Sequence, residues 1–181
     1  MGGELGSGEV QVPDTCICPI CAGIMDPGGE HTHIKPDDIV DRGDSTLTFV
    51  SPYFVRGSEG HVIVVSKEHY KTFKEVPRVV GGNKVFDATR KAAAAMILAY
   101  SGVEWITTIS SDKPEDGYHS AHYQVAVYPR KSNDELYASL ANPDAGIYLA
   151  DLSVRAELAA KLRPLLVEPP KPVTLRFPKP R

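Results

Sequence analysis

Two apolar stretches in the first half of the chain have the pattern of β-strands. Residues 46–50 alternate between polar and apolar side chains and are followed by a Ser-Pro dipeptide, which terminates a strand. Residues 62–65 are an uninterrupted run of valine and isoleucine, introduced by His61. Such a β-branched run is typical of a strand buried on both faces. The first half of the chain therefore predicts a sheet with a buried central strand.

One long helical pattern follows these strands. Apolar residues recur at three- and four-residue spacing from Val85 to Ala99, and most of them are alanines. Asn83 is a suitable N-cap, and Gly102 ends the pattern. A stripe of such small side chains lets a helix lie close against a sheet.

The second half returns to strands and ends in a helix and a tail. Residues 104–110 and 118–128 predict two further strands, and residues 151–165 predict a second helix. Residues 168–181 are rich in proline and lysine and show no core pattern. The order of strands, one long helix and more strands predicts an α+β fold with an antiparallel sheet packed by a helix.

Composition excludes some partners. The formal net charge is −3, and 24% of residues are charged. This balance favours neither a nucleic-acid backbone nor an anionic membrane as partner. No apolar run approaches the roughly 18 to 20 residues that a membrane span requires. The glycine-rich first residues lack the pattern of a signal peptide, so the expected location is the cytoplasm.

Three cysteines lie close together, at Cys16, Cys18 and Cys21. Neighbouring cysteines cannot connect distant parts of a fold, so disulfides are not expected. The two-residue spacing of Cys18 and Cys21 lets both thiolates bind one tetrahedral zinc ion. A redox pair is the alternative, but that motif belongs before a helix in a βαβ unit, which the sequence does not show.

The strand around His122 carries the candidate chemistry. Because successive side chains of a strand point to opposite faces, one face is apolar and packs on the core, and the other holds a histidine beside a glutamine. The apolar face consists of Tyr123, Val125 and Val127, and the other of His122, Gln124 and Ala126. An imidazole is a nucleophile near neutral pH, and a glutamine amide can donate a hydrogen bond to a phosphoryl oxygen. The alternative is a polar strand face open to water.

The combined motifs resemble the histidine-triad superfamily. The resemblance covers residues 16–130, with residues 1–15 as a flexible lead-in and residues 131–181 as a C-terminal extension with a helix and a Pro-rich tail. It implies a fold of an antiparallel sheet packed by one long helix, nucleotide binding and a homodimer. The matching motifs are Cys18-Pro-Ile-Cys21, Gly60-His61-Val-Ile-Val-Val-Ser-Lys67-Glu-His69, His122-Tyr-Gln124 and Pro129-Arg130.

The resemblance also implies an activity. In catalytic members a strand histidine attacks an α-phosphate and forms a covalent nucleotidyl-histidine. We assign this role to His122 at the middle triad position and place Gln124 at the third, with Ser120 at the first. Glutamine at the third position is similar to the branch of galactose-1-phosphate uridylyltransferase and the diadenosine polyphosphate phosphorylases. It favours nucleotidyl transfer on a nucleotide or nucleotide sugar.

Other functions remain open. One is hydrolysis of a nucleotide through the same intermediate. Another is a non-catalytic, zinc-stabilised nucleotide-binding module, which the missing histidine at Ser120 supports. A third is action on an unusual phosphorylated metabolite, with residues 131–181 shaping its pocket or a dimer interface.

The family resemblance assigns the remaining site residues. In zinc-bearing members a structural ion is held by the cysteine pair, a histidine after the central strand and the first triad histidine. The first three correspond to Cys18, Cys21 and His69. Because serine is a poor zinc ligand, we assign the fourth position to His119, turned by a β-bulge, with Cys16 as a substitute. Substrate contacts are assigned to His61, Lys113 and Arg130.

Overall fold

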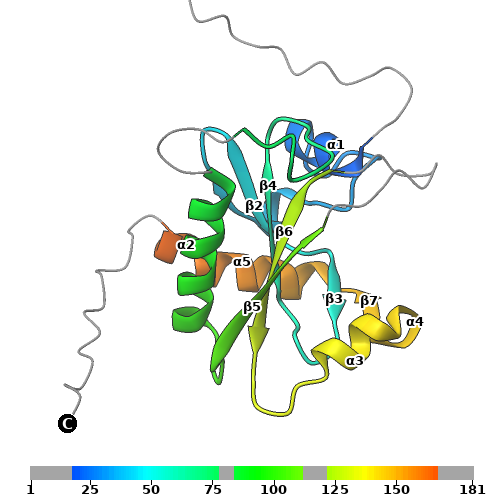
Figure 1. The fold of residues 1–181 in the computed structure, drawn as a ribbon, viewed down its shortest axis with the longest axis vertical. Helices are drawn as coiled ribbons and strands as arrows, with labels where there is room; N and C mark the ends of the chain where they lie inside the picture. Colours follow the sequence, from blue (N-terminus) through cyan, green and yellow to red (C-terminus); the bar gives the residue numbers. More distant parts are fainter. Residues whose placement is uncertain (1–17, 78–83, 112–121, 167–181) are drawn as a thin grey trace, which may run out of the picture.

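A five-stranded antiparallel sheet forms the centre of the protein. The computed structural model describes residues 18–77, 84–111 and 122–166. The sheet has the strand order β1-β2-β4-β6-β5, and a second sheet pairs β3 with β7 (Figure 1). The strands are β1 (Ile39–Arg42), β2 (Thr46–Val50), β3 (Tyr53–Val55), β4 (Val62–Ser66), β5 (Trp105–Ser111), β6 (Gln124–Arg130) and β7 (Ile147–Leu149).

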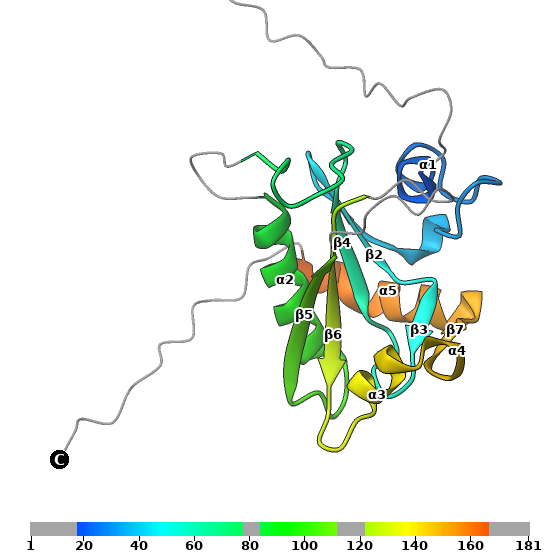
Figure 2. The same ribbon diagram turned by 45° about the vertical axis from the view of Figure 1, so that its right-hand side comes forward.

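Two helices cover one face of this sheet. Helix α2 (Lys84–Ala99) places its alanine stripe on β4 and β6, as its periodicity predicts, and helix α5 (Leu152–Leu166) packs beside it (Figure 2). The strand side chains of this core come from alternate positions, because only every second residue faces the helices. The core contains Val50, Val62, Val64, Tyr123, Val125, Val127, Ala92, Ala95, Met96, Ala159 and Leu162.

The opposite face of the sheet is a second core. Helix α1 (Pro19–Met25) and helix α3 (Leu136–Ala141) lie over it, and short helices at Pro36–Asp38 and Pro143–Gly146 (α4) complete the connections. Ala126, which the alternative interpretation placed on a face open to water, is only 5% exposed. The covering side chains come from segments distant in sequence, so alternation along one strand does not reveal them. This core contains Ile34, Ile39, Leu47, Phe49, Val55, Ile63, Val65, Ala126, Tyr128 and Leu136.

Helix α5 is attached to the sheet by two arginines. Arg155 is 2% exposed and lies 3.3 Å from the carboxylate of Asp38, which is also buried. Arg163 donates hydrogen bonds to the carbonyl oxygens of Ile39 at 2.8 Å and Asp37 at 2.5 Å. The segment beyond residue 130 therefore shares the core of the sheet. Within the described residues, no helix combines the length and apolar character that crossing a bilayer requires.

Candidate metal centre

Local folding at the start of helix α1 brings the two cysteines together. Pro19 occupies the first turn of the helix, where its missing N–H costs nothing. Cys18 is the N-cap, and its Sγ accepts a hydrogen bond from the backbone N–H of Cys21 at 3.5 Å. The two thiols therefore lie one helical turn apart and point to the same side.

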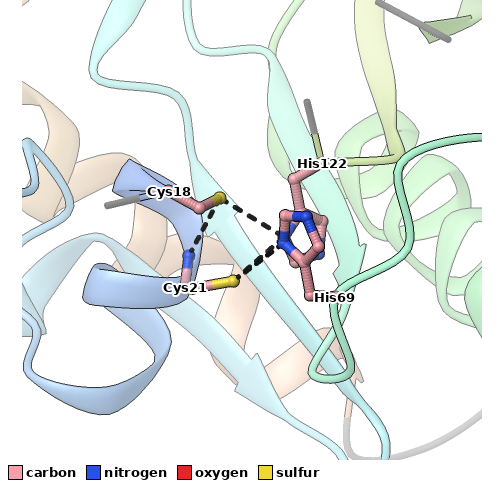
Figure 3. Close-up of side chains that lie close together, drawn as sticks. All are labelled: Cys18, Cys21, His69 and His122. Carbon is pink, nitrogen blue, oxygen red and sulfur yellow. Dashed lines mark hydrogen bonds between the residues drawn. The ribbon is translucent and has the colours of Figure 1, made fainter. Parts of the chain in front are cut away.

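Two histidines from other elements complete the cluster. His69 lies in the connection after β4, and His122 lies two residues before β6. One ligand atom from each of Cys18, Cys21, His69 and His122 lies within 4.8 Å of the others (Figure 3). The Nδ1 atom of His122 is 3.6 Å from the sulfur of Cys18 and 3.5 Å from that of Cys21. The Nδ1 atom of His69 is 3.1 Å from the sulfur of Cys21.

These distances suit a tetrahedral zinc ion. Zn–S bonds of about 2.3 Å and Zn–N bonds of about 2.0–2.1 Å at tetrahedral angles separate sulfur from nitrogen by about 3.5 Å. The donor set of two sulfurs and two nitrogens is also the one that zinc prefers. Cys18, Cys21 and His122 are each less than 10% exposed. The four residues therefore fit a closed structural site.

The hydrogen bond of His122 fixes its tautomer. Its Nε2 atom lies 3.0 Å from the carbonyl oxygen of Ser66. A carbonyl oxygen only accepts, so Nε2 carries a proton, and in a neutral ring this leaves the lone pair on Nδ1. That lone pair faces the two sulfurs. A ligating histidine in metalloproteins commonly makes such a bond through its second nitrogen.

The chemistry of the thiols favours a cation at the centre of these four residues. The hydrogen bond that the Cys21 thiol donates to Cys18, together with burial, raises the pKa of Cys21 above its ordinary value. Both effects oppose the free thiolate. A bound divalent cation reverses this balance, because its charge stabilises the deprotonated thiol.

Solved structures similar to this chain place the site in context. A zinc-bound histidine triad family protein from Mycobacterium smegmatis superposes with a TM-score of 0.57 at 18% identity, covering 83% of this chain and 93% of that one. The chain has the histidine-triad fold. The Plasmodium falciparum diadenosine triphosphate hydrolase gives a TM-score of 0.52 at 12% identity, covering 74% of this chain and 79% of that one.

Transferases also share this fold. A uridylyltransferase gives a TM-score of 0.52 at 14% identity, with 83% of this chain covered, and this chain spans 45% of that one. No family model and no curated protein sequence matches the chain. Histidine-triad neighbours thus include both hydrolases and transferases.

The structure gathers three of the four expected ligands and adds His122 to them. His119, expected as the fourth ligand, and Lys113, expected near phosphate, lie outside the described residues. His122, expected to attack a phosphate, instead has both ring nitrogens engaged, one at Ser66 and one at the sulfurs. This placement differs from that of an imidazole free to attack a phosphate. Its cause is the antiparallel pairing of β4 with β6, which brings the end of β4 beside His122.

Gln124 and Ala126, which follow His122 on the same face of the strand, differ in burial. Gln124 is half-buried and pairs with Val65 of β4 and Ser111 of β5. Ala126 follows on the same face and is buried. Among the described residues of this row, only Gln124 offers a polar side chain to a ligand.

His61 lies deep in the same face. It is 4% exposed, its ring stacks on Tyr128 with centroids 4.6 Å apart, and its Nδ1 has no hydrogen-bond partner among the described residues. Burial lowers the pKa of His61 to about 3, so the ring is neutral.

Arg130 is engaged by its own chain. Its Nε and Nη2 donate to the two carboxylate oxygens of Asp134 at 2.6 and 2.7 Å, and its Nη1 donates to Thr107 at 2.9 Å. The Arg130 guanidinium holds the pKa of Asp134 below its ordinary value. Expected to offset phosphate charge, Arg130 is instead neutralised within the fold. Asp134 was not expected as its partner, although the four-residue spacing was a usable signal.

Proposed function

We propose that this chain is a nucleotide-binding protein of the histidine-triad fold, in which His122 is the fourth ligand of a structural zinc ion and not a nucleophile. The observation that carries this proposal is the position of the His122 Nδ1 lone pair beside Cys18 and Cys21. Zinc bound by all four groups would tie helix α1 to the sheet and leave no open coordination position for water.

This role for His122 shifts the triad register by one place. In zinc-bearing relatives, the first triad histidine is the metal ligand. With His122 at that place, Gln124 takes the middle position, where the nucleophile belongs, and Ala126 takes the third. An amide nitrogen is not nucleophilic, whereas its N–H can donate to a phosphoryl oxygen. The arrangement favours binding of a nucleotide phosphate without a covalent intermediate.

Nucleotidyl transfer or hydrolysis through His122 is the competing function. Its support is the presence of a diadenosine triphosphate hydrolase and a uridylyltransferase among the structural neighbours. Both functions include a bound nucleotide. They differ in whether phosphorus becomes bonded to an imidazole.

Incubation with diadenosine triphosphate or a uridine diphosphate sugar separates these functions. We expect saturable binding by calorimetry, no nucleotidyl adduct by intact-mass spectrometry at neutral pH, and no released nucleoside monophosphate. Gln124→Ala should weaken binding about 5-fold, the effect of one lost hydrogen bond of about 1 kcal/mol. An adduct mapped to His122 by peptide sequencing would contradict the proposal, and so would an absence of binding.

Exchange of single histidines tests the fourth ligand. His122→Asn should reduce the zinc content of the purified protein from one ion per chain to a small fraction, because it removes one of four donors. His119→Asn should leave the zinc content unchanged. Metal analysis by mass spectrometry measures both. The reverse pattern would restore His119 as the ligand and release His122 for chemistry.

A further inference from the structure

The sheet face covered by helices α1 and α3 is accessible to solvent along β5 and the start of β6. Its residues on β2 and β4 are fully buried, with Leu47 and Val65 at 0% exposure. Along β5 and the start of β6, in contrast, Thr107, Ile109 and Gln124 are half-buried. The register of β5 and β6 places these three side chains on the same face. A ligand that contacts Gln124 can therefore extend over β5.

Two exposed aromatic rings lie beyond Thr107, at the end of this accessible surface that is farthest from Gln124. Trp105 begins β5 and is 42% exposed, and Tyr137 of helix α3 is 63% exposed. Both rings lie against the guanidinium of Arg130, whose central carbon is 5.7 Å from the Trp105 ring centroid and 4.6 Å from that of Tyr137. Cation–π contacts of this kind hold aromatic rings in defined orientations.

The rings are fixed by a neutral, buried ion pair. The Arg130 side chain is 7% exposed and that of Asp134 is 2% exposed, and their bidentate pair is further anchored to Thr107. The guanidinium therefore orients the rings but has no uncompensated charge for a phosphate. What the cluster offers outward is flat aromatic surface. Such surface binds nucleobases by stacking, with little dependence on sequence or base type.

We propose that Trp105 and Tyr137 form a stacking site for a nucleobase of the ligand whose phosphate contacts Gln124. This site rests on the proposed nucleotide binding. Arg130 lies six positions after Gln124 on β6, at a distance of about 20 Å. That distance is longer than the reach from phosphate to base within a mononucleotide, so the stacked base would belong to the farther nucleoside of a ligand in which phosphates join two nucleosides. Arg130 and Asp134 act as positioning residues for the two rings.

The fluorescence of Trp105 reports directly on this site, because it is the only tryptophan in the chain. Titration of the full chain with diadenosine triphosphate, corrected for ligand absorption with free tryptophan amide, should give saturable quenching. Inorganic phosphate should give none, and AMP should bind more weakly because it reaches only one end. Equal affinity for AMP would overturn the two-ended arrangement.

Variants of Tyr137 supply the matched comparison. Tyr137→Ala removes a stacking ring and should weaken binding of diadenosine triphosphate about 10-fold, whereas Tyr137→Phe keeps the ring and should bind as the parent does. Tyr148→Ala removes a similarly exposed ring on β7 and should have no effect. Thermal melting identifies any variant that fails to fold.

Two outcomes separate this inference from the proposed function. Binding seen by equilibrium dialysis without quenching, and unchanged in Tyr137→Ala, would overturn the stacking site and leave nucleotide binding in place. An absence of binding would overturn both. Quenching that follows protein concentration without ligand would show that a second copy of the chain covers the rings, and would also overturn the site.

Discussion

Replacement of Cys21 by serine is expected to remove the zinc ion and lower Tm by roughly 8–16 °C. Zinc that binds only the folded chain stabilises it by about 4 kcal/mol when its free concentration is about 1,000 times Kd, and 1 kcal/mol corresponds to roughly 2–4 °C for a chain of this size. The expected loss follows from the length of helix α1: seven residues form a marginal helix by themselves, and a bound metal would tie this helix to the sheet. Calorimetry with and without a chelator measures it.

The neighbouring cysteine provides the control. Cys16→Ser should keep both the zinc content and Tm, because four described residues already supply the donors of a tetrahedral site. A chelator should lower the Tm of Cys16→Ser as it does for the parent, and should leave Cys21→Ser unchanged. A Cys21→Ser protein that retains one zinc ion per chain and the parent Tm would refute the metal centre.

Arg155→Met is expected to cost about 3–5 kcal/mol of folding free energy, because it leaves Asp38 buried without its counter-charge. Burial raises the pKa of Asp38, and the charge of Arg155 partly offsets this effect. Without Arg155 the pKa rises further. A carboxyl whose pKa is raised in the folded state gains relative stability as pH falls through that value. The cost in urea denaturation should thus be smaller at about pH 5 than at about pH 8.

Two further variants make this test specific. Arg155→Met combined with Asp38→Leu removes both charges and should recover most of the lost stability. Lys161→Met breaks an exposed pair with Glu157 on the same helix, and should change stability by less than about 1 kcal/mol. Equal costs for Arg155→Met and Lys161→Met would show that the buried pair has no special role.

Much of the fold follows from local patterns in the sequence. The alternation of Tyr123, Val125 and Val127 correctly assigns the helix-covered face of β6, and the alanine stripe correctly locates α2. The short elements β1, β3, β7, α1 and α3 were not predicted. Each has three to seven residues, too few for a periodic pattern, and tertiary packing decides their structure.

The residues of the metal cluster also differ in how far the sequence indicates them. Spacing alone indicates Cys18 and Cys21, and the family resemblance indicates His69. His122 joins them through the carbonyl of Ser66, a contact between residues far apart in the sequence. No local sequence pattern indicates such a contact. For the same reason the sequence gives no sign that Arg155 is buried, since its partner Asp38 lies far from it in the sequence.

The position of helix α5 restricts how this protein can be shortened. A fragment that stops at Arg130 would include all three cysteines and all six histidines. It would nevertheless leave one wall of the valine core facing water, because Ala159 and Leu162 supply that wall. Exposed apolar surface of this kind promotes aggregation. Recombinant versions intended for crystallisation or NMR therefore need to continue through Leu166.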